Sequence, residues 1–284
     1  MYFDSHAHIA SSPKAYDDIH AVIKRACDCG VERIVDAAID IKTSKAVLQM
    51  SQIYPNLIIP TLGLQPELLI PGSDIYLKSF DIGLEIKKLR EFYFEDEGQF
   101  KAVGECGLDY YWVDKLLDRK QQSKVRGLQR ILLKQQIEFA KEVKLPLIVH
   151  SRGAEEECLQ IINSKLKVKD SKVRILFHSY TGDLEIARRI FEAGYYISFN
   201  GILTYASAED IRTIFRLGWK SFRKQVLSET DSPYLVPRGG KGRVCEPGDV
   251  KFVVEEMANL IGESVEDVAY TIFENAERFY SIDT

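Results

Sequence analysis

Residues 146–150 read PLIVH and residues 173–178 read VRILFH, two short apolar runs that each end in a histidine. Apolar runs of this length, rich in β-branched residues, are typical of strands buried on both faces. A helical stretch separates the two runs, and two strands joined through a helix form a parallel βαβ unit. This part of the chain therefore predicts an α/β fold in which neighbouring strands carry a histidine at their ends.

The same alternation of strand and helix continues along the whole chain. We expect strands at residues 2–8, 32–38, 57–63, 100–106, 146–150, 173–178, 195–200 and 225–230. Between the strands lie segments with helical spacing of apolar residues, such as Ile19, Val22, Ile23 and Ala26. Eight such units predict a single (β/α)8 TIM barrel over residues 1–284 as one domain, because this fold typically takes about 250 residues.

The alternative architecture is a doubly wound open sheet. That fold would place a glycine-rich phosphate-binding turn after the first strand, where residues 5–12 read SHAHIASS. The barrel is therefore favoured, with expanded loops after the third strand (64–80) and the fourth (107–134). Between Lys115 and Lys134 the second of these carries seven Lys or Arg against one Asp. Such a charge run indicates either a solvated helix face or a basic surface near the site.

The composition argues against several classes of protein. A net charge of −4 does not suit a surface that coats nucleic acid, although it leaves room for a local basic patch. No apolar stretch approaches the roughly 18 residues of a membrane span, and the N-terminus lacks the pattern of a signal peptide. Five cysteines, an odd number, suit a reducing cytoplasm better than a disulfide framework. We expect a cytoplasmic protein with no membrane contact and no obligate protein partner.

Cys27 and Cys29 raise the question of a shared metal ion. They lie in a helix-like stretch, where residues two apart point to different faces. Ordinary buried thiols are therefore the better interpretation.

The positions of the histidines carry most of the functional information. Of the five in the chain, His6, His8, His150 and His178 stand at the ends of predicted strands. In a barrel these ends open into one cup, where the active site is built. His6 and His8 are two apart on a strand, so both face the same way and can bind one ion. Asp4 shares their face and is a candidate to orient a ligand from behind.

Two carboxylates occupy equivalent positions. Glu105 ends the fourth predicted strand and Asp231 follows the eighth, both after apolar runs where an unpaired carboxylate is costly to bury. Four imidazoles and two carboxylates at one rim make a mixed nitrogen and oxygen site, which suits zinc, manganese or a similar divalent ion.

Several longer phrases resemble the signature blocks of the TatD-type metal-dependent hydrolases, a family of the broader amidohydrolase-like group of barrels. These phrases are FDSHAHI, AVGECGLDYY, PLIVHSR, FHSYTG, YYISFNG and LSETDSPYLVP, in order along most of the chain. The resemblance implies metal ligands at His6, His8, Glu105, His150, His178 and Asp231. It also implies that Glu105 bridges two ions and that the activity is hydrolysis of phosphodiester bonds in DNA.

The sequence departs from the family pattern at two positions. Gln65, in GLQP, stands where the family usually has histidine, and Cys245 stands where it usually has asparagine before Glu246 and Pro247. A glutamine can hydrogen-bond a substrate oxygen but cannot carry a proton. The first departure therefore affects substrate contact or leaving-group protonation rather than metal binding.

A mechanism follows from these assignments. One or two divalent ions (zinc, manganese or magnesium) would activate water, with Asp231 as general base and Glu105 as the second catalytic carboxylate. Gln65 and Arg152 are candidate substrate contacts. The loop PRGGKGR would bring further cations to the same rim, where they could form a basic collar that binds phosphate. The alternative is that this loop is only a soluble turn. The cations are Arg238, Lys241 and Arg243.

Three functions remain open from the sequence. The first is a phosphodiesterase or nuclease acting on single-stranded or terminal nucleic acid, or on a small phosphodiester. The second is an amidohydrolase-like enzyme acting on a small amide, ester or lactone, for which a basic collar has no purpose. The third is a catalytically silent metal-binding protein, which would have a closed coordination shell.

Overall fold

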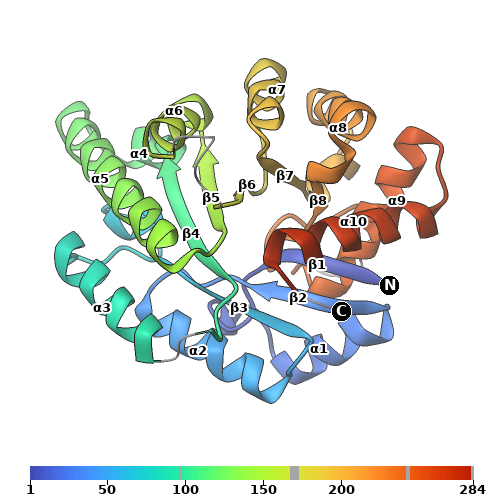
Figure 1. Ribbon diagram of the computed structural model, residues 1–284, viewed down its shortest axis with the longest axis horizontal. Helices are drawn as coiled ribbons and strands as arrows, with labels where there is room; N and C mark the ends of the chain where they lie inside the picture. Colours follow the sequence, from blue (N-terminus) through green and yellow to red (C-terminus); the bar gives the residue numbers. More distant parts are fainter. Residues whose placement is uncertain (96–97, 167–172, 241–243, 283–284) are drawn as a thin grey trace.

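A computed structural model describes residues 1–95, 98–166, 173–240 and 244–282. All eight predicted strands are present, and they form one parallel sheet in the order β1 to β8 (Figure 1). The strands are β1 (Tyr2–Ala7), β2 (Val31–Asp36), β3 (Ile58–Leu62), β4 (Ala102–Asp109), β5 (Leu147–Arg152), β6 (Ile175–Phe177), β7 (Tyr196–Phe199) and β8 (Val226–Ser228). The predicted (β/α)8 barrel is confirmed.

The barrel closes along a seam between its first strand and the segment that follows its last. Ala7 forms a parallel bridge with Ser232. The amide of Asp231 donates to the carbonyl of His6 at 2.9 Å, and the amide of His8 donates to the carbonyl of Ser232 at 2.7 Å. These bonds fix Asp231 beside the two histidines of β1.

Helices surround the strands (Figure 1). The α-helices are α1 (Ile19–Asp28), α2 (Ile41–Ile53), α3 (Ile82–Glu95), α4 (Tyr110–Leu116), α5 (Arg119–Val143), α6 (Glu155–Lys165), α7 (Leu184–Glu192), α8 (Glu209–Phe222), α9 (Val250–Ile261) and α10 (Val265–Tyr280). The 3-10 helices are η1 (Pro13–Ala15), η2 (Pro66–Leu69), η3 (Gly201–Thr204), η4 (Arg223–Gln225) and η5 (Pro247–Asp249).

The two long connections differ in character. The connection after β3 contains only the short helix η2 before α3 begins. The connection after β4 is largely helical, because Asp109 caps α4 by accepting from the amide of Trp112, and Asp118 caps α5 by accepting from the amides of Lys120 and Gln121. The basic run therefore lies on two helices and not on an irregular loop.

The N-terminal end of the barrel is filled by apolar side chains. One buried residue from each strand packs there against Phe273, Ala276, Phe279 and Tyr280 of α10. The strand residues are Phe3, Val35, Ile59, Ala102, Ile148, Leu176, Tyr196 and Leu227. The polar side chains at the other ends of the strands are therefore left to form the cup. None of the described helices combines the length and the apolar character needed to cross a membrane.

Candidate metal centre

The six predicted ligands converge at the C-terminal ends of five strands. His6 lies on β1 and His8 follows it, while Glu105 lies on β4. His150 lies on β5, His178 comes directly after β6, and Asp231 follows β8. The side chains of His150 and Asp231 are 16% and 14% exposed, more than those of the other four. These two side chains are therefore the predicted ligands most accessible to solvent.

Glu105 stands between two groups of nitrogen atoms. Its Oε2 lies 3.3 Å from Nε2 of His8 and 3.8 Å from Nε2 of His6. Its Oε1 lies 2.7 Å from Nδ1 of His150 and 3.1 Å from Nε2 of His178. One carboxylate thus presents a different oxygen to each pair of histidines.

Among the described residues, four groups of side chains have the spacing needed to hold a metal ion. One joins Glu229 to His6 and His178, one joins Glu67 and Asp109 to His150, and two consist only of predicted ligands. In the first of these two, one atom from each of His6, His8 and Asp231 lies within 4.8 Å of the others. In the second, the same holds for Glu105, His150 and His178. Asp231 belongs to the first group because its Oδ1 lies 3.6 Å from Nε2 of His8 and 3.8 Å from Nε2 of His6.

The outer nitrogens of three histidines face acceptors. Those of His8 and His150 lie within hydrogen-bond distance, which fixes the orientation of these two rings, whereas Nδ1 of His178 makes no hydrogen bond among the described residues. Nδ1 of His8 lies 3.1 Å from the carbonyl of Ala37, and Nε2 of His150 lies 3.0 Å from Oδ2 of Asp109. Nδ1 of His178 lies 3.5 Å from Oε1 of Glu229. A ring that donates outward keeps the lone pair of its inner nitrogen free for a metal ion. The donor set and its orientation therefore fit divalent ions.

The backbone near the centre is shaped for close approach. A side chain on Gly107, whose φ is +148°, would place its Cβ only 1.9 Å from the carbonyl oxygen of His150. Only glycine therefore allows β4 and β5 to pack at the level of the site. Asp231 has a φ of +57°, a left-handed conformation that is uncommon outside glycine and often marks a functional residue.

Electrostatics within the centre follow from its burial. Burial raises the pKa of Asp231 to about 6, partly opposed by the positive charge of His178 and His8. Burial also opposes the charge of Glu105, but the charge of His178 and hydrogen bonds from the histidines outweigh it and hold the pKa of Glu105 well below its usual range. Although burial acts against it, contact with Asp109 and Glu105 raises the pKa of His150 to about 10. Without a metal ion, the negative charge of Glu105 is thus compensated by protonated histidines. A divalent cation would supply the same positive charge.

The other predicted contacts have different surroundings. Gln65 is buried, and its Oε1 accepts from the amide of Glu67 at 2.7 Å, so it caps η2. Arg238 is exposed, and its amide donates to Oγ1 of Thr204 at 2.8 Å. Arg152 is exposed at the end of β5. Lys241 and Arg243 lie outside the described residues.

Two further predictions from the sequence concern Asp4 and the pair Cys27 and Cys29. Asp4 does not contact a histidine ring, because its carboxylate accepts from the amide and hydroxyl of Thr230, at 2.8 and 2.6 Å. It therefore braces the segment before Asp231.

The interpretation of Cys27 and Cys29 as buried thiols was wrong, because Cys27 is exposed and Cys29 is half-buried. They occupy the last turn and the cap of α1, where the helix meets solvent.

Sequence reasoning missed two carboxylates behind the histidines. Asp109 was visible in the phrase AVGECGLDYY, and Glu229 lies two residues before Asp231 in LSETDSP. Both side chains are fully buried. A carboxylate next to a predicted strand end was the available signal, because such groups need a partner when buried.

Comparison with known families identifies the kind of protein that carries this centre. The family model described as TatD related DNase matches residues 3–281. The chain belongs to the TatD-related DNase family. It is 32% identical over 284 residues to the uncharacterized metal-dependent hydrolase YabD of Bacillus subtilis, with 100% of both chains covered. The match to the uncharacterized metal-dependent hydrolase TatD of Mycobacterium tuberculosis is 26% identical and covers 98% of this chain and 97% of the relative. This TatD-family chain is a metal-dependent hydrolase.

Solved structures show the same fold. The TatD homologue YjjV of Escherichia coli superposes with a TM-score of 0.80 at 24% identity, covering 99% of this chain and 98% of that one. The organophosphorus hydrolase of Deinococcus radiodurans has a TM-score of 0.63 at 13% identity, covering 98% and 92%. The TatD-family barrel thus extends to structures with little sequence in common.

Proposed function

We propose that this TatD-family chain is a phosphodiesterase that cleaves nucleic acid with two divalent ions bridged by Glu105. The observation that carries the proposal is the position of the Glu105 carboxylate, whose two oxygens face separate histidine pairs. In this assignment His6, His8 and Asp231 hold one ion and His150 and His178 hold the other. Two ions bridged by one carboxylate form the arrangement that many phosphodiester-cleaving enzymes use.

The side chains suggest how the reaction proceeds. Divalent ions held by these residues would lower the pKa of a bound water and stabilise the negative charge on an attacked phosphate. Asp231 would orient the attacking water and accept its proton, because its carboxylate lies beside Nε2 of His6 and His8, where one ion would be held. Gln65 can donate a hydrogen bond to the departing oxygen but no proton, so that proton must come from solvent.

Nucleic acid is supported as the substrate by two observations. The matching family model is named for DNase activity. Two exposed cations lie on the rim at the C-terminal ends of the strands, because Arg152 ends β5 and Arg238 follows β8. The alternative substrate, a small amide, ester or lactone, needs no cation there.

The number and identity of the ions are part of the proposal. Histidine nitrogen and carboxylate oxygen suit zinc and manganese, and magnesium is the third candidate. We also propose that the protein works in a reducing compartment such as the cytoplasm, which its five free cysteines support.

A single experiment separates the alternatives. Protein stripped with chelator and reloaded with manganese, zinc or magnesium is assayed on bis(p-nitrophenyl) phosphate, p-nitrophenyl acetate and short single-stranded DNA. We expect metal-dependent cleavage of the diester and the DNA, which falls at least 100-fold in Asp231→Asn, since removing a general base typically costs about 10²–10⁴ in rate. The exposed residue Asp28 provides a matched control, because Asp28→Asn makes the same chemical change far from the centre. Activity on the acetate alone would replace the proposal with the small-molecule esterase.

A further inference from the structure

Four side chains beside the metal centre form a cluster of stacked cations and aromatic rings. The guanidinium of Arg152 lies 4.1 Å from the ring centre of Tyr111 and 5.8 Å from that of Trp112. Nζ of Lys115 lies 4.3 Å from the ring centre of Trp112 and 5.3 Å from that of Tyr111. We call these four residues the Arg152 cluster.

The cluster adjoins the proposed metal ligands through two strands. Arg152 follows His150 by two residues on β5, so the two side chains project on the same side of the strand. In the register between β4 and β5, Arg152 pairs with Asp109, whose carboxylate contacts the ring of His150. Helix α4, which carries the rest of the cluster, begins directly after Asp109. The cluster therefore lies on the rim of the cup.

The cations of the cluster are held by rings rather than by carboxylates. Among the described residues, no carboxylate forms an ion pair with Arg152 or Lys115. Other cations of the same basic run are neutralised, since Arg126 pairs with Asp114 and Arg130 pairs with Glu157. A guanidinium stacked on a ring uses its face, so its N–H edges stay free for a phosphate.

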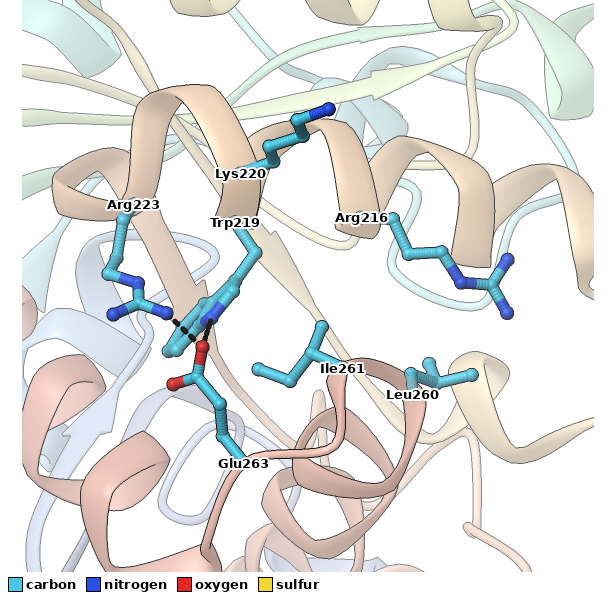
Figure 2. A pocket seen from close by; sticks show the side chains of 7 residues that line it. All are labelled: Arg216, Trp219, Lys220, Arg223, Leu260, Ile261 and Glu263. Atoms are coloured by element: carbon cyan, nitrogen blue, oxygen red, sulfur yellow. Dashed lines mark hydrogen bonds and ion pairs between the residues drawn. The ribbon is translucent and has the colours of Figure 1, made fainter.

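A second stacked cation elsewhere in the barrel shows the contrast. Arg223 lies over Trp219 at 4.5 Å, in a surface cavity between α8 and the end of α9 (Figure 2). There Glu263 accepts from the Arg223 guanidinium and, at 3.0 Å, from the Trp219 ring nitrogen. η4, which begins at Arg223, leads into β8, so this pair lies at the opposite end of the strand from the centre. The cation of this pair is therefore already bound by a carboxylate, unlike the cations of the Arg152 cluster.

We propose that the Arg152 cluster binds the nucleotides next to the cleaved bond of a single-stranded nucleic acid. Arg152 and Lys115 bind its phosphates, and an unpaired base stacks on the ring of Tyr111, which is 43% exposed. A base within a duplex would offer no free face to this ring. This inference rests on the proposed phosphodiesterase function and adds to it the side chains that hold the substrate beside the metal centre.

The test begins with binding, measured by fluorescence anisotropy of a labelled oligothymidylate with cleavage-resistant phosphorothioate linkages, so that the result does not depend on catalysis. The metal-loaded protein and the variants Tyr111→Ala and Arg152→Gln are compared, with Arg223→Gln as the matched control. We expect each cluster variant to weaken binding about tenfold or more, as for loss of a stacking or phosphate contact. The control should bind like the unaltered protein. Equal affinity in all four proteins would overturn the inference.

Two further comparisons separate base stacking from a general loss of charge. An oligonucleotide without bases should bind Tyr111→Ala as well as it binds the unaltered protein, because no base remains to stack. Lys115→Gln should flatten the dependence of log affinity on log salt by about 0.7, the contribution of one phosphate contact on a single strand. An unchanged salt slope, or a Tyr111→Ala defect that persists without bases, would contradict the assignment.

Failure of the proposed function gives a different pattern. If the protein cleaves bis(p-nitrophenyl) phosphate but the cluster variants bind the oligonucleotide normally, the phosphodiesterase stands and the cluster assignment falls. If cluster variants lose affinity but no diester is cleaved, the binding site stands and the proposed reaction falls.

Discussion

Oε1 of Glu229 lies 3.5 Å from Nδ1 of His178, whose Nε2 lies 3.1 Å from Oε1 of Glu105. Within the described chain, neither Nδ1 of His178 nor Oε1 of Glu229 has a hydrogen-bond partner, and both atoms are buried. The other oxygen of Glu229 accepts from the hydroxyl of Ser198. The carboxylate is therefore fixed behind a proposed ligand, where it also belongs, with His6 and His178, to a group spaced to hold a metal ion.

Removing this carboxylate should weaken metal binding. We expect Glu229→Ala to lower the affinity for one ion by about 10–100-fold, because outer partners of ligand histidines typically contribute that much. Glu229→Gln retains an acceptor oxygen and should lose less. Titration against a chelating dye measures both, and circular dichroism checks the fold. An alanine variant that binds metal like the unaltered protein would contradict the role.

The bridging position of Glu105 makes a prediction about stoichiometry. Glu105→Gln removes the charge shared by both groups and should reduce binding of both ions. His150→Ala removes a ligand from one group only and should leave the group of His6 and His8 able to bind. Elemental analysis of the protein after gel filtration gives the ions per chain. Retention of two ions by Glu105→Gln would show that the carboxylate does not bridge.

Metal ions should also stabilise the fold, because the centre joins five strands. An ion that binds only the folded chain, present at 100 times its dissociation constant, adds about 2.7 kcal/mol. For a chain of this size that corresponds to a rise in Tm of roughly 5 °C or more. Scanning calorimetry of stripped and reloaded protein measures it, with Glu105→Gln as the control that should respond less. An identical Tm with and without metal would argue against binding at the centre.

Gln65 provides a test of the missing proton donor. Its side-chain oxygen caps η2 at the amide of Glu67, so the residue has a structural role that histidine in one tautomer can also fill. We expect Gln65→His to add a limb to the pH profile of kcat near the usual histidine pKa of about 6.5, with higher activity where the new group is protonated. Gln65→Ala should gain no such limb. A profile unchanged by histidine would exclude position 65 from leaving-group protonation.

The sequence predicted the barrel and the side chains that converge at its rim because both depend on local patterns. Apolar runs placed the strands, and the position of His150 at a strand end placed its side chain in the cup. Pairing between distant elements could not be predicted in this way. Arg130 reads as part of a basic collar, but its partner Glu157 lies on α6.

The same limit explains the carboxylates that were missed. Glu229 becomes a partner of His178 only when β6 and β8 are brought into one barrel. Gln65 looked free to meet substrate, whereas its oxygen is taken by the turn that it begins. Local sequence identifies which residues face the cup, and tertiary packing decides which of them remain available there.

The seam between β1 and the segment after β8 has a consequence for synthesis of the protein. Glu105, His150 and His178 are all present once the ribosome has passed residue 178, whereas His6 and His8 must wait for Asp231. Chains are made from the N-terminus and begin to fold in that order. The nascent chain therefore contains all residues of the group of Glu105 before it contains those of the group of Asp231. The second proposed metal group is complete only when the segment after β8 can pair with β1 and close the barrel.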